Sequence, residues 1–429
     1  MTTRRDFLAK AAAASAALVS VRAALAATPA GQAPDAALIA RAQALLARAP
    51  FIDTHNDLPT MLLEVAAGDL THLDLGVRQP TLCADVPSLR QGRVGAQYWS
   101  VFVESATQKT HVALHEALRE FDAALRLIRS QPDFEQARTA DDIERIHGAG
   151  KIACLMGVEG GHMIENSPAA LRVFAELGAR YMTLTHWDNI GWADAATDRP
   201  QNYGLTGLGK ELVHEMNRLG MFADLSHVSA DSMRDALHVT RAPVIFSHSN
   251  AFAINPHPRN VPDDVLRLLK ENGGVVHVNF IRVFVSPDGQ AWLGRREAAL
   301  REARGRLTEE AAVTAAMAAW DASAGPPRAT VSDVADHIDH IRKVAGIDHI
   351  GIGADFYKAP DAVDMATGLA DVTRYPDLFA ELLRRGYSDE DVLKIAGRNH
   401  LRAMRRMERV AAELRQHEAP LITEGVKSS

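Results

Sequence analysis

Hydrophobic and polar positions follow two alternating patterns from residue 50 onward. Short, mostly apolar runs are separated by longer stretches in which apolar residues recur every three or four positions. The short runs predict buried strands, and the longer stretches predict amphipathic helices packed against them. Eight runs follow one another in this way: 51–55, 97–103, 151–159, 180–186, 221–227, 243–248, 274–280 and 349–356.

Several helical stretches also carry recognisable ends. Ser167 followed by Pro168 predicts a helix start, because Ser caps free backbone N–H groups and Pro fits the first turn. Pro-Asp-Asp at 262–264 predicts another start, and Asn-Gly-Gly at 272–274 predicts the end of that helix. Apolar residues at helical spacing predict a third helix within 204–220.

Eight strand–helix alternations favour a parallel sheet covered by helices. Continuous apolar strands are typical of parallel sheets that are buried on both faces. In a chain of 429 residues, the closed arrangement is an α/β fold of the (β/α)8, or TIM barrel, type. An open doubly wound sheet is the alternative, but no Gly-x-Gly-x-x-Gly motif follows the first strand. We therefore predict the barrel.

A helical insertion is predicted between the seventh and eighth strands. Residues 283–330 contain a charged helical stretch from Arg295 to Arg306, an Ala-rich stretch and a Gly-Pro-Pro sequence at 325–327. A segment after a barrel strand leaves the carboxyl-end face, where this insertion could cover a site. A role in packing or oligomer formation fits the pattern equally well.

The first 26 residues predict a twin-arginine signal peptide. Arg4-Arg5 is followed by Phe7-Leu8, an Ala-rich apolar segment and Ala24-Leu25-Ala26, which has the form of a cleavage site. An amphipathic helix or membrane anchor is the alternative, although Arg22 interrupts the apolar segment and leaves it too short to span a bilayer. We expect a periplasmic protein without stable membrane insertion after signal removal.

This signal sets the expected division of the chain. We expect the signal peptide over 1–26, a linker and helix over 27–49, one barrel domain over 50–410 and a tail over 411–429.

The formal net charge of −7 argues against a nucleic-acid partner, which would require a basic surface. The two cysteines, Cys83 and Cys154, are too few for a disulfide framework and do not indicate thiol catalysis.

Imidazole and carboxyl side chains recur at the same end of six predicted strands. The carboxyl ends of barrel strands converge on one mouth, so residues distant in sequence become neighbours there. Buried groups of these kinds carry a large desolvation cost, which a divalent cation removes by coordination. The residues are His55 and Asp57 on the first strand, Glu159, His186, His227, His248 and Asp355.

The ligand types favour zinc, although manganese or cobalt also fits. Three imidazoles with two carboxylates form a mixed nitrogen and oxygen set. Five ligands exceed what one tetrahedral zinc needs, so two metal ions sharing one bridging carboxylate fit better. We interpret most other histidines, such as His257, His349 and His400, as surface or core residues.

The chain resembles the membrane dipeptidase family, peptidase family M19, among the amidohydrolase-like barrels. The resemblance covers roughly residues 50–405 and rests on motifs that include DTHNDLP, GVEGGH, YMTLTHWDN, PVIFSHSN, RNVPDDVL and IGIGADF. Many other amidohydrolases carry His-x-His on the first strand and a bridging lysine on the fourth. This chain has His55-Asn56-Asp57 instead and no lysine over 181–186, which leaves the bridging role to Glu159.

The resemblance implies a site with two Zn²⁺ ions per subunit. It implies that His55 and Asp57 bind the first zinc, that Glu159 bridges both, and that His227 and His248 bind the second. It also implies that His186 contacts the substrate carbonyl, that Arg259 holds the terminal carboxylate, and that Asp355 lies near the amino group and transfers the proton.

The implied activity is hydrolysis of dipeptides, including those with a carboxyl-terminal D-residue, by a metal-bridging hydroxide. A homodimer is expected because the family often forms one. Two departures concern the site. Phe356-Tyr357-Lys358 stands where the family usually has Phe-Asp-Gly, and the insertion over 283–330 is longer than we expect for a segment of the family core. The alternatives are another amide, β-lactam or lactone hydrolase on the same scaffold, or a non-catalytic periplasmic zinc- or peptide-binding protein.

Overall fold

The computed structural model describes residues 35–70, 73–325, 328–358 and 364–422. The predicted signal peptide lies outside these residues. The chain divides into two units, Met1–Ala36 and Ala37–Ser429, and the barrel belongs entirely to the second. None of the helices in the described ranges combines the length and apolarity needed to cross a bilayer.

Nine parallel strands form the sheet, and eight of them close into a barrel. Closure comes from pairing of the second strand with the fourth. The third strand pairs with Ile152–Cys154 of the fourth, below the residues that pair with the fifth, and so stands beside the ring. The strands are β1 (Phe51–Asn56), β2 (Val94–Phe102), β3 (Phe134–Gln136), β4 (Ile152–Glu159), β5 (Ala179–Thr183), β6 (Phe222–Asp224), β7 (Ile245–Phe246), β8 (Val275–Val278) and β9 (Ile350–Ile352).

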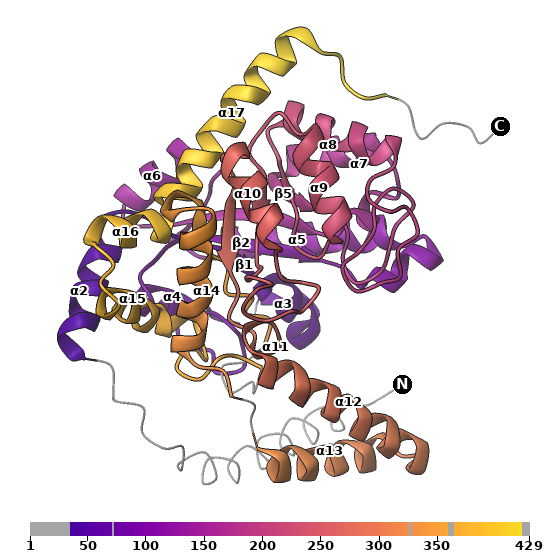
Figure 1. The fold of residues 1–429 in the computed structure, drawn as a ribbon, viewed down its shortest axis with the longest axis vertical. Helices are drawn as coiled ribbons and strands as arrows, with labels where there is room; N and C mark the ends of the chain where they lie inside the picture. Colours follow the sequence, from indigo (N-terminus) through magenta and orange to yellow (C-terminus); the bar gives the residue numbers. More distant parts are fainter. Residues whose placement is uncertain (1–34, 71–72, 326–327, 359–363, 423–429) are drawn as a thin grey trace. The chain divides into compact units, whose positions relative to one another are not determined.

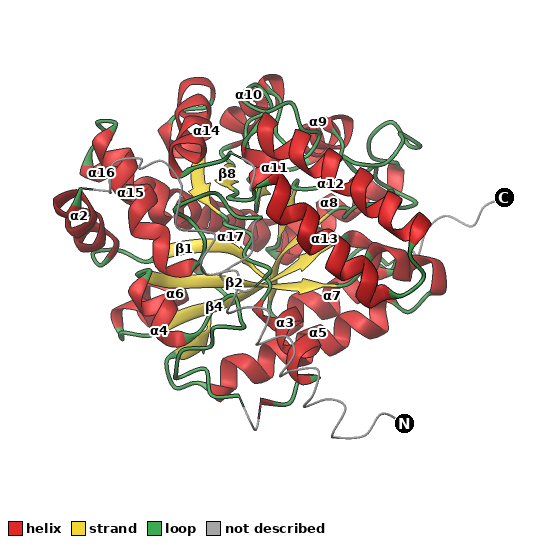
Figure 2. Cartoon of the chain, turned by 90° about the horizontal axis from the view of Figure 1, so that it is seen from below, coloured by secondary structure: helices red, strands yellow, loops and turns green. Residues whose placement is uncertain are grey.

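The predicted (β/α)8 barrel is therefore confirmed, with β3 as an unpredicted addition. Helices surround the strands (Figure 2). They are α2 (Ala36–Leu46), α3 (Leu58–Ala66), α4 (Val86–Gln91), α5 (Ala113–Ser130), α6 (Ala140–Gly148), α7 (Pro168–Leu177), α8 (Gly207–Leu219), α9 (Ala230–Val239), α10 (Asp263–Asn272), α11 (Arg282–Val285), α12 (Pro287–Arg306), α13 (Glu310–Ala324), α14 (Val331–Val344), α15 (Tyr375–Arg384), α16 (Asp389–Leu393) and α17 (Asn399–His417).

The helix ends follow the local signals in the sequence. The Ser167 side chain accepts a hydrogen bond from the Ala170 N–H at the start of α7. Helix α10 ends at Gly273, whose φ of 83° is left-handed and therefore suits glycine. At the other end of the chain, α17 continues through position 410 to His417.

Two large aromatic side chains fill part of the barrel interior. Tyr98 on β2 and Tyr181 on β5 are fully buried, and their stacked rings lie 5.4 Å apart. Between these strands, β4 carries Gly157, where a Cβ atom would lie 1.9 Å from the Tyr181 ring. Glycine is required there because any side chain would displace this tyrosine.

Helix α17 begins against the barrel interior. His400, in its first turn, lies 2.9 Å from the Tyr98 hydroxyl through Nε2 and 3.1 Å from His277 Nε2 through Nδ1. All three side chains are buried. The apolar cluster of these strands continues onto α17 through Leu401 and Met404. One end of the barrel core is thus closed by α17.

The predicted insertion forms a helical hairpin, α12 and α13, between the seventh and eighth barrel strands (Figure 1). The hairpin has contacts of its own: Arg296 binds Asp321 through two hydrogen bonds of 2.8 and 3.1 Å, and the Trp292 and Trp320 rings lie 5.6 Å apart. Its packing therefore does not depend on the barrel alone.

The base of the insertion is joined to the segment that follows β9. The Arg282 N–H donates to Asp364 O at 2.7 Å, and the Thr367 N–H donates to Ala329 O at 2.7 Å. Asp364 also accepts hydrogen bonds from Tyr357 and Lys358, the residues that depart from the family pattern. The insertion is consequently fixed to the chain that leads away from Asp355.

Acid should destabilise the protein through its buried histidines. Burial lowers the pKa of His277 and of His337 to about 4 and lowers the pKa of His400 well below its usual range. An unfolded histidine has a pKa of about 6.5, so the unfolded chain binds protons first as the pH falls. Stability should be complete above about pH 6.5 and should decline from there toward pH 4.

Urea unfolding of chelator-treated protein between pH 7.5 and pH 5 measures this decline. His337→Gln removes one titrating group, so the midpoint of this variant should fall less steeply with pH. A midpoint that stays constant over this range in the unsubstituted protein would contradict the prediction.

Candidate metal centre

The polar side chains predicted at the barrel mouth lie in or just after the strands. His55 and Glu159 lie at the ends of β1 and β4, and Asp57 follows β1 directly. The predicted strands were too long at the other positions, because β5, β6, β7 and β9 end two or three residues before His186, His227, His248 and Asp355.

Two of these four residues have a backbone conformation that keeps them out of a strand. His227 and Asp355 have φ values of 68° and 67°, in the left-handed region that a β-strand cannot contain. Non-glycine residues in this region carry strain, which is typical of functional sites. The turn at each residue takes its side chain out of the pattern in which successive strand residues point to opposite faces of the sheet.

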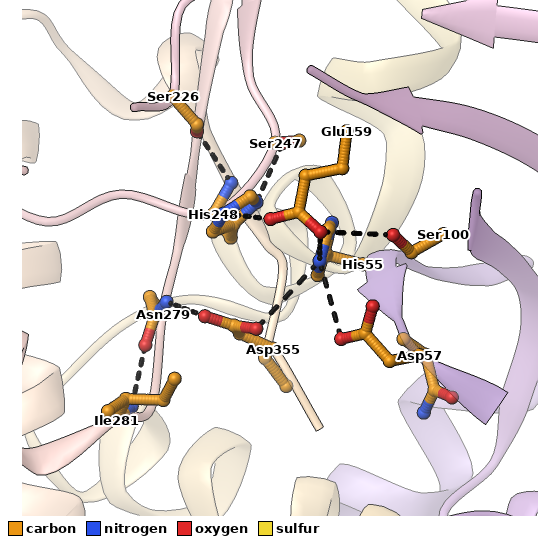
Figure 3. Close-up of polar contacts among 12 residues, drawn as sticks. His55, Asp57, Ser100, Glu159, Ser226, Ser247, His248, Asn279, Ile281 and Asp355 are labelled. Carbon is orange, nitrogen blue, oxygen red and sulfur yellow. Dashed lines mark hydrogen bonds and ion pairs between the residues drawn. The ribbon is translucent and has the colours of Figure 1, made fainter. Parts of the chain in front are cut away.

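Glu159 lies at the centre of the cluster and presents a different oxygen to each side. Its Oε2 lies 3.4 Å from His55 Nε2 (Figure 3). Its Oε1 lies 3.1 Å from His227 Nε2, 3.4 Å from His248 Nε2 and 3.8 Å from His186 Nε2. One buried carboxylate thus connects His55 with three other imidazoles.

Two further carboxylates lie beside His55. Its Nε2 lies 3.5 Å from Asp57 Oδ2 and 3.8 Å from Asp355 Oδ1. All of these side chains are buried. Three sets of donor atoms that could each hold a metal ion result: His55, Glu159 and His248; Glu159, His186 and His227; and His55, Asp57 and Asp355.

The hydrogen bond behind His55 directs a lone pair into this cluster. The Tyr181 hydroxyl donates to Thr54 O at 3.2 Å and therefore accepts from His55 Nδ1, 3.0 Å away. With the proton on Nδ1, the Nε2 atom is an acceptor. This buried atom has no hydrogen-bond partner among the described residues. A cation at the cluster would satisfy it.

His248 is oriented by a similar chain. Ser247 Oγ donates to Asp224 Oδ2 at 2.5 Å and accepts from His248 Nδ1 at 2.8 Å. His248 Nε2 then faces His227 Nε2 at 2.9 Å. Second hydrogen bonds of this kind fix the tautomer of metal-binding histidines. The donor set and the unpartnered nitrogen therefore fit divalent metal ions.

Asp224 is a buried residue behind the cluster that sequence reasoning missed. It is fully buried and also accepts hydrogen bonds from Thr183 and from the backbone N–H groups of Ser226 and Ser247. The available signal was a charged residue inside an apolar run, three positions before His227. Its role is to hold Ser247 behind His248.

Burial sets the protonation of three imidazoles and of one carboxyl group. It lowers the pKa of His186 to about 4 and lowers the pKa values of His227 and His248 well below the usual range. Neutral imidazole is the form that binds metals. Burial also raises the pKa of Asp355 to about 7, so its carboxyl group can exchange a proton near neutral pH.

Arg259 is a buried cation with weak polar contacts. It lies in the loop after β7, and its Nη atoms lie 3.4 Å from His248 O and 3.5 Å from Ser249 Oγ. Its Nε has no hydrogen-bond partner among the described residues. Burial lowers its pKa to about 10, which still leaves it charged at neutral pH. Such a guanidinium can still bind an anionic group.

Comparison with known proteins places these features in a family. The model of the membrane dipeptidase family, peptidase family M19, matches residues 39–418. Dipeptidase tcpJ from Claviceps purpurea (strain 20.1) is 41% identical over 337 residues, which cover 76% of this chain and 70% of that protein.

Two crystal structures are similar in fold. The probable dipeptidase PvdM from Pseudomonas aeruginosa superposes with a TM-score of 0.75 at 24% identity, covering 87% of this chain and 99% of the other. A metallo peptidase from Rhodobacter sphaeroides, liganded with a phosphinate mimic of the dipeptide L-Ala-D-Ala, has a TM-score of 0.67 at 25% identity, covering 84% of this chain and 99% of the other.

The family match spans the barrel and every residue of the cluster. The resemblance stated from the sequence motifs is confirmed. The chain therefore belongs to the membrane dipeptidase family, peptidase family M19, whose members are metallopeptidases that act as dipeptidases.

Proposed function

We propose that this protein is a binuclear zinc dipeptidase that accepts dipeptides with a carboxyl-terminal D-residue. The observation that carries the proposal is the position of Glu159, with Oε2 toward His55 and Oε1 toward His227 and His248. His55 and Asp57 would hold one ion, His227 and His248 the other, and Glu159 both. Bound zinc would polarise the substrate carbonyl and lower the pKa of coordinated water from ~15.7 to about 7.

His186 would stabilise negative charge on the substrate carbonyl oxygen. Its pKa of about 4 leaves it neutral, with one ring N–H to donate. Its Nε2 lies on the Oε1 side of Glu159, and its Nδ1 has no hydrogen-bond partner among the described residues. A donor aimed at the developing oxyanion typically contributes a factor of about 10² to 10³ in rate.

The site carries side chains of both charge signs. Arg259 contacts the backbone of His248, and Asp57 and Asp355 lie beside His55. We propose that Arg259 binds the substrate carboxylate through two parallel hydrogen bonds and that the amino group lies toward Asp355. A substrate fixed at both charged ends has a defined length, which favours dipeptides over longer peptides.

Asp355 would transfer the proton. Its carboxyl group, whose pKa is about 7 in the metal-free protein, would accept a proton during attack and return it to the leaving amine. The dipeptide mimic bound to the Rhodobacter sphaeroides relative supports this substrate class.

We further propose the cellular setting from the sequence. Residues 1–26 would act as a twin-arginine signal that brings a folded enzyme to the periplasm. The linker and helix over 27–49 would connect it to the catalytic domain over 50–410, followed by the tail over 411–429.

Metal removal tests the proposal directly. Purified protein should hydrolyse a panel of L,L and L,D dipeptides, lose this activity with a chelator and recover it when zinc is returned. Elemental analysis should give two metal ions per chain. Hydrolysis of β-lactams or lactones but not dipeptides would favour another hydrolase, and no hydrolysis by metal-replete protein would favour a binding protein.

Glu159→Ala tests the bridging carboxylate. The variant should bind less metal per chain, because both metal positions lose an oxygen ligand. Glu120→Ala is the matched control, since Glu120 is also a buried glutamate but hydrogen-bonds Thr60 and belongs to none of the three donor sets. Full metal occupancy in Glu159→Ala would exclude the bridging role.

Arg259→Lys tests carboxylate recognition. Lysine keeps the charge but cannot form two parallel hydrogen bonds, so KM for dipeptides should rise roughly 10- to 100-fold. The variant should also discriminate less between a dipeptide and its carboxyl-terminal amide. An unchanged KM would remove Arg259 from substrate binding.

A further inference from the structure

We infer that Asn279 is a positioning residue for the reaction: its side-chain amide holds one oxygen of Asp355 and so turns the other oxygen toward the metal cluster. The inference rests on the proposed function, in which Asp355 transfers the proton. Asn279 directly follows β8 and is fully buried. It did not emerge from the sequence motifs as a site residue.

The hydrogen bonds define the orientation of the Asn279 amide. The backbone N–H of Ile281, which can only donate, lies 2.6 Å from one side-chain atom of Asn279. That atom must be the carbonyl oxygen, Oδ1. The other atom is then the NH₂ group, which donates to Asp355 Oδ2 at 2.7 Å (Figure 3).

This bond distinguishes the two oxygens of Asp355. Oδ2 is occupied by Asn279, whereas Oδ1 lies 3.8 Å from His55 Nε2. The terminal torsion of an aspartate side chain is broad, so an untethered carboxylate rotates easily. The bond from Asn279 limits this rotation and keeps Oδ1 on the side of His55 and the metal cluster.

Asn279 is itself held on both sides by Asn250. Its N–H donates to Asn250 Oδ1 at 3.1 Å, and Asn250 Nδ2 donates to Asn279 O at 3.2 Å. The Asn250 carbonyl in turn accepts from the Val261 N–H at 2.7 Å, two positions after Arg259. One chain of buried amides thus joins Asp355 to the loop that carries Arg259.

This connection relates the two ends of the proposed substrate site. Asp355, which would transfer the proton, and the loop of Arg259, which would bind the carboxylate, are joined by the same series of hydrogen bonds. A catalytic carboxyl group held by a fixed partner keeps its productive geometry without reorganisation. The bond from Ile281 shapes the local turn, whereas the bond to Asp355 is the one that reaches the site.

Asn279→Leu in the metal-loaded enzyme tests the inference. Leucine has a similar volume but cannot donate to Asp355. With L-Ala-D-Ala as substrate, kcat should fall about tenfold to a hundredfold, since only part of the 10²- to 10⁴-fold contribution of acid–base catalysis is lost. KM should stay within about threefold, because Arg259 still binds the carboxylate, and the metal content should not change.

Asn399→Leu is the matched control. Asn399 is also a buried asparagine, and its Nδ2 donates to Ile347 O at 2.7 Å and to Ile350 O at 2.9 Å, at the opposite end of β9 from Asp355. This variant should lose thermal stability but keep its kcat. Equal losses of kcat in the two variants would show that Asn279 is merely structural and would overturn the inference.

Asn279→Asp covers the case in which the leucine variant does not fold. It keeps the shape and the acceptor for Ile281 but places an oxygen instead of an NH₂ group against Asp355. Its kcat should fall at least as far as expected for Asn279→Leu. A kcat within about twofold of the unsubstituted enzyme in any folded Asn279 variant would overturn the inference.

Failure of the proposed function would be recognised separately. It would appear as an unsubstituted, metal-loaded enzyme that hydrolyses no dipeptide. Crystal structures of the metal-loaded protein and of Asn279→Leu would then decide the positioning role. A rotated Asp355 carboxylate in the variant supports the role, and an unchanged carboxylate excludes it.

Discussion

The structure depends on a single buried carboxylate that faces two groups of imidazoles at once. Removing an ion from water costs several kcal/mol even after the protein relaxes, so a buried Glu159 needs hydrogen-bond donors or a cation beside it. His55 on one side and His227 and His248 on the other surround it at 3.1 to 3.4 Å. The barrel makes this possible because strands distant in sequence deliver their ends to one place.

Hydrogen bonds behind the cluster determine which atoms it presents. Tyr181 supports His55, and Asp224 supports His248 through Ser247. Tyr181 occupies its position because Gly157 leaves room for the ring. The geometry of the cluster is therefore distributed through the barrel core, and residues that touch no ligand atom help to determine it.

The barrel and the convergence of its polar residues were accessible from sequence because both follow from repeated local patterns. The start of α7 at Ser167 and the end of α10 at Gly273 depend on neighbouring residues only. The left-handed backbone at His227 and Asp355 was not accessible, since residue type alone does not predict a positive φ at a histidine or an aspartate.

The support of the site was also hidden from sequence reasoning. Asn279 and Asp355 are 76 positions apart. No sequence periodicity relates an amide that follows one strand to a carboxylate that follows the next strand. Strand β3 was missed for a different reason, because a half-buried segment of three residues carries too weak a pattern.

The α12–α13 hairpin has a consequence for how such enzymes diversify. Its helices hold each other through Arg296, Asp321 and two tryptophans, and its two ends are joined by main-chain and side-chain hydrogen bonds around Arg282 and Ala329. A segment with contacts of its own and one small attachment can vary in sequence with little effect on the barrel. Chimeras that exchange this hairpin between relatives would therefore keep the residues of the metal cluster unchanged.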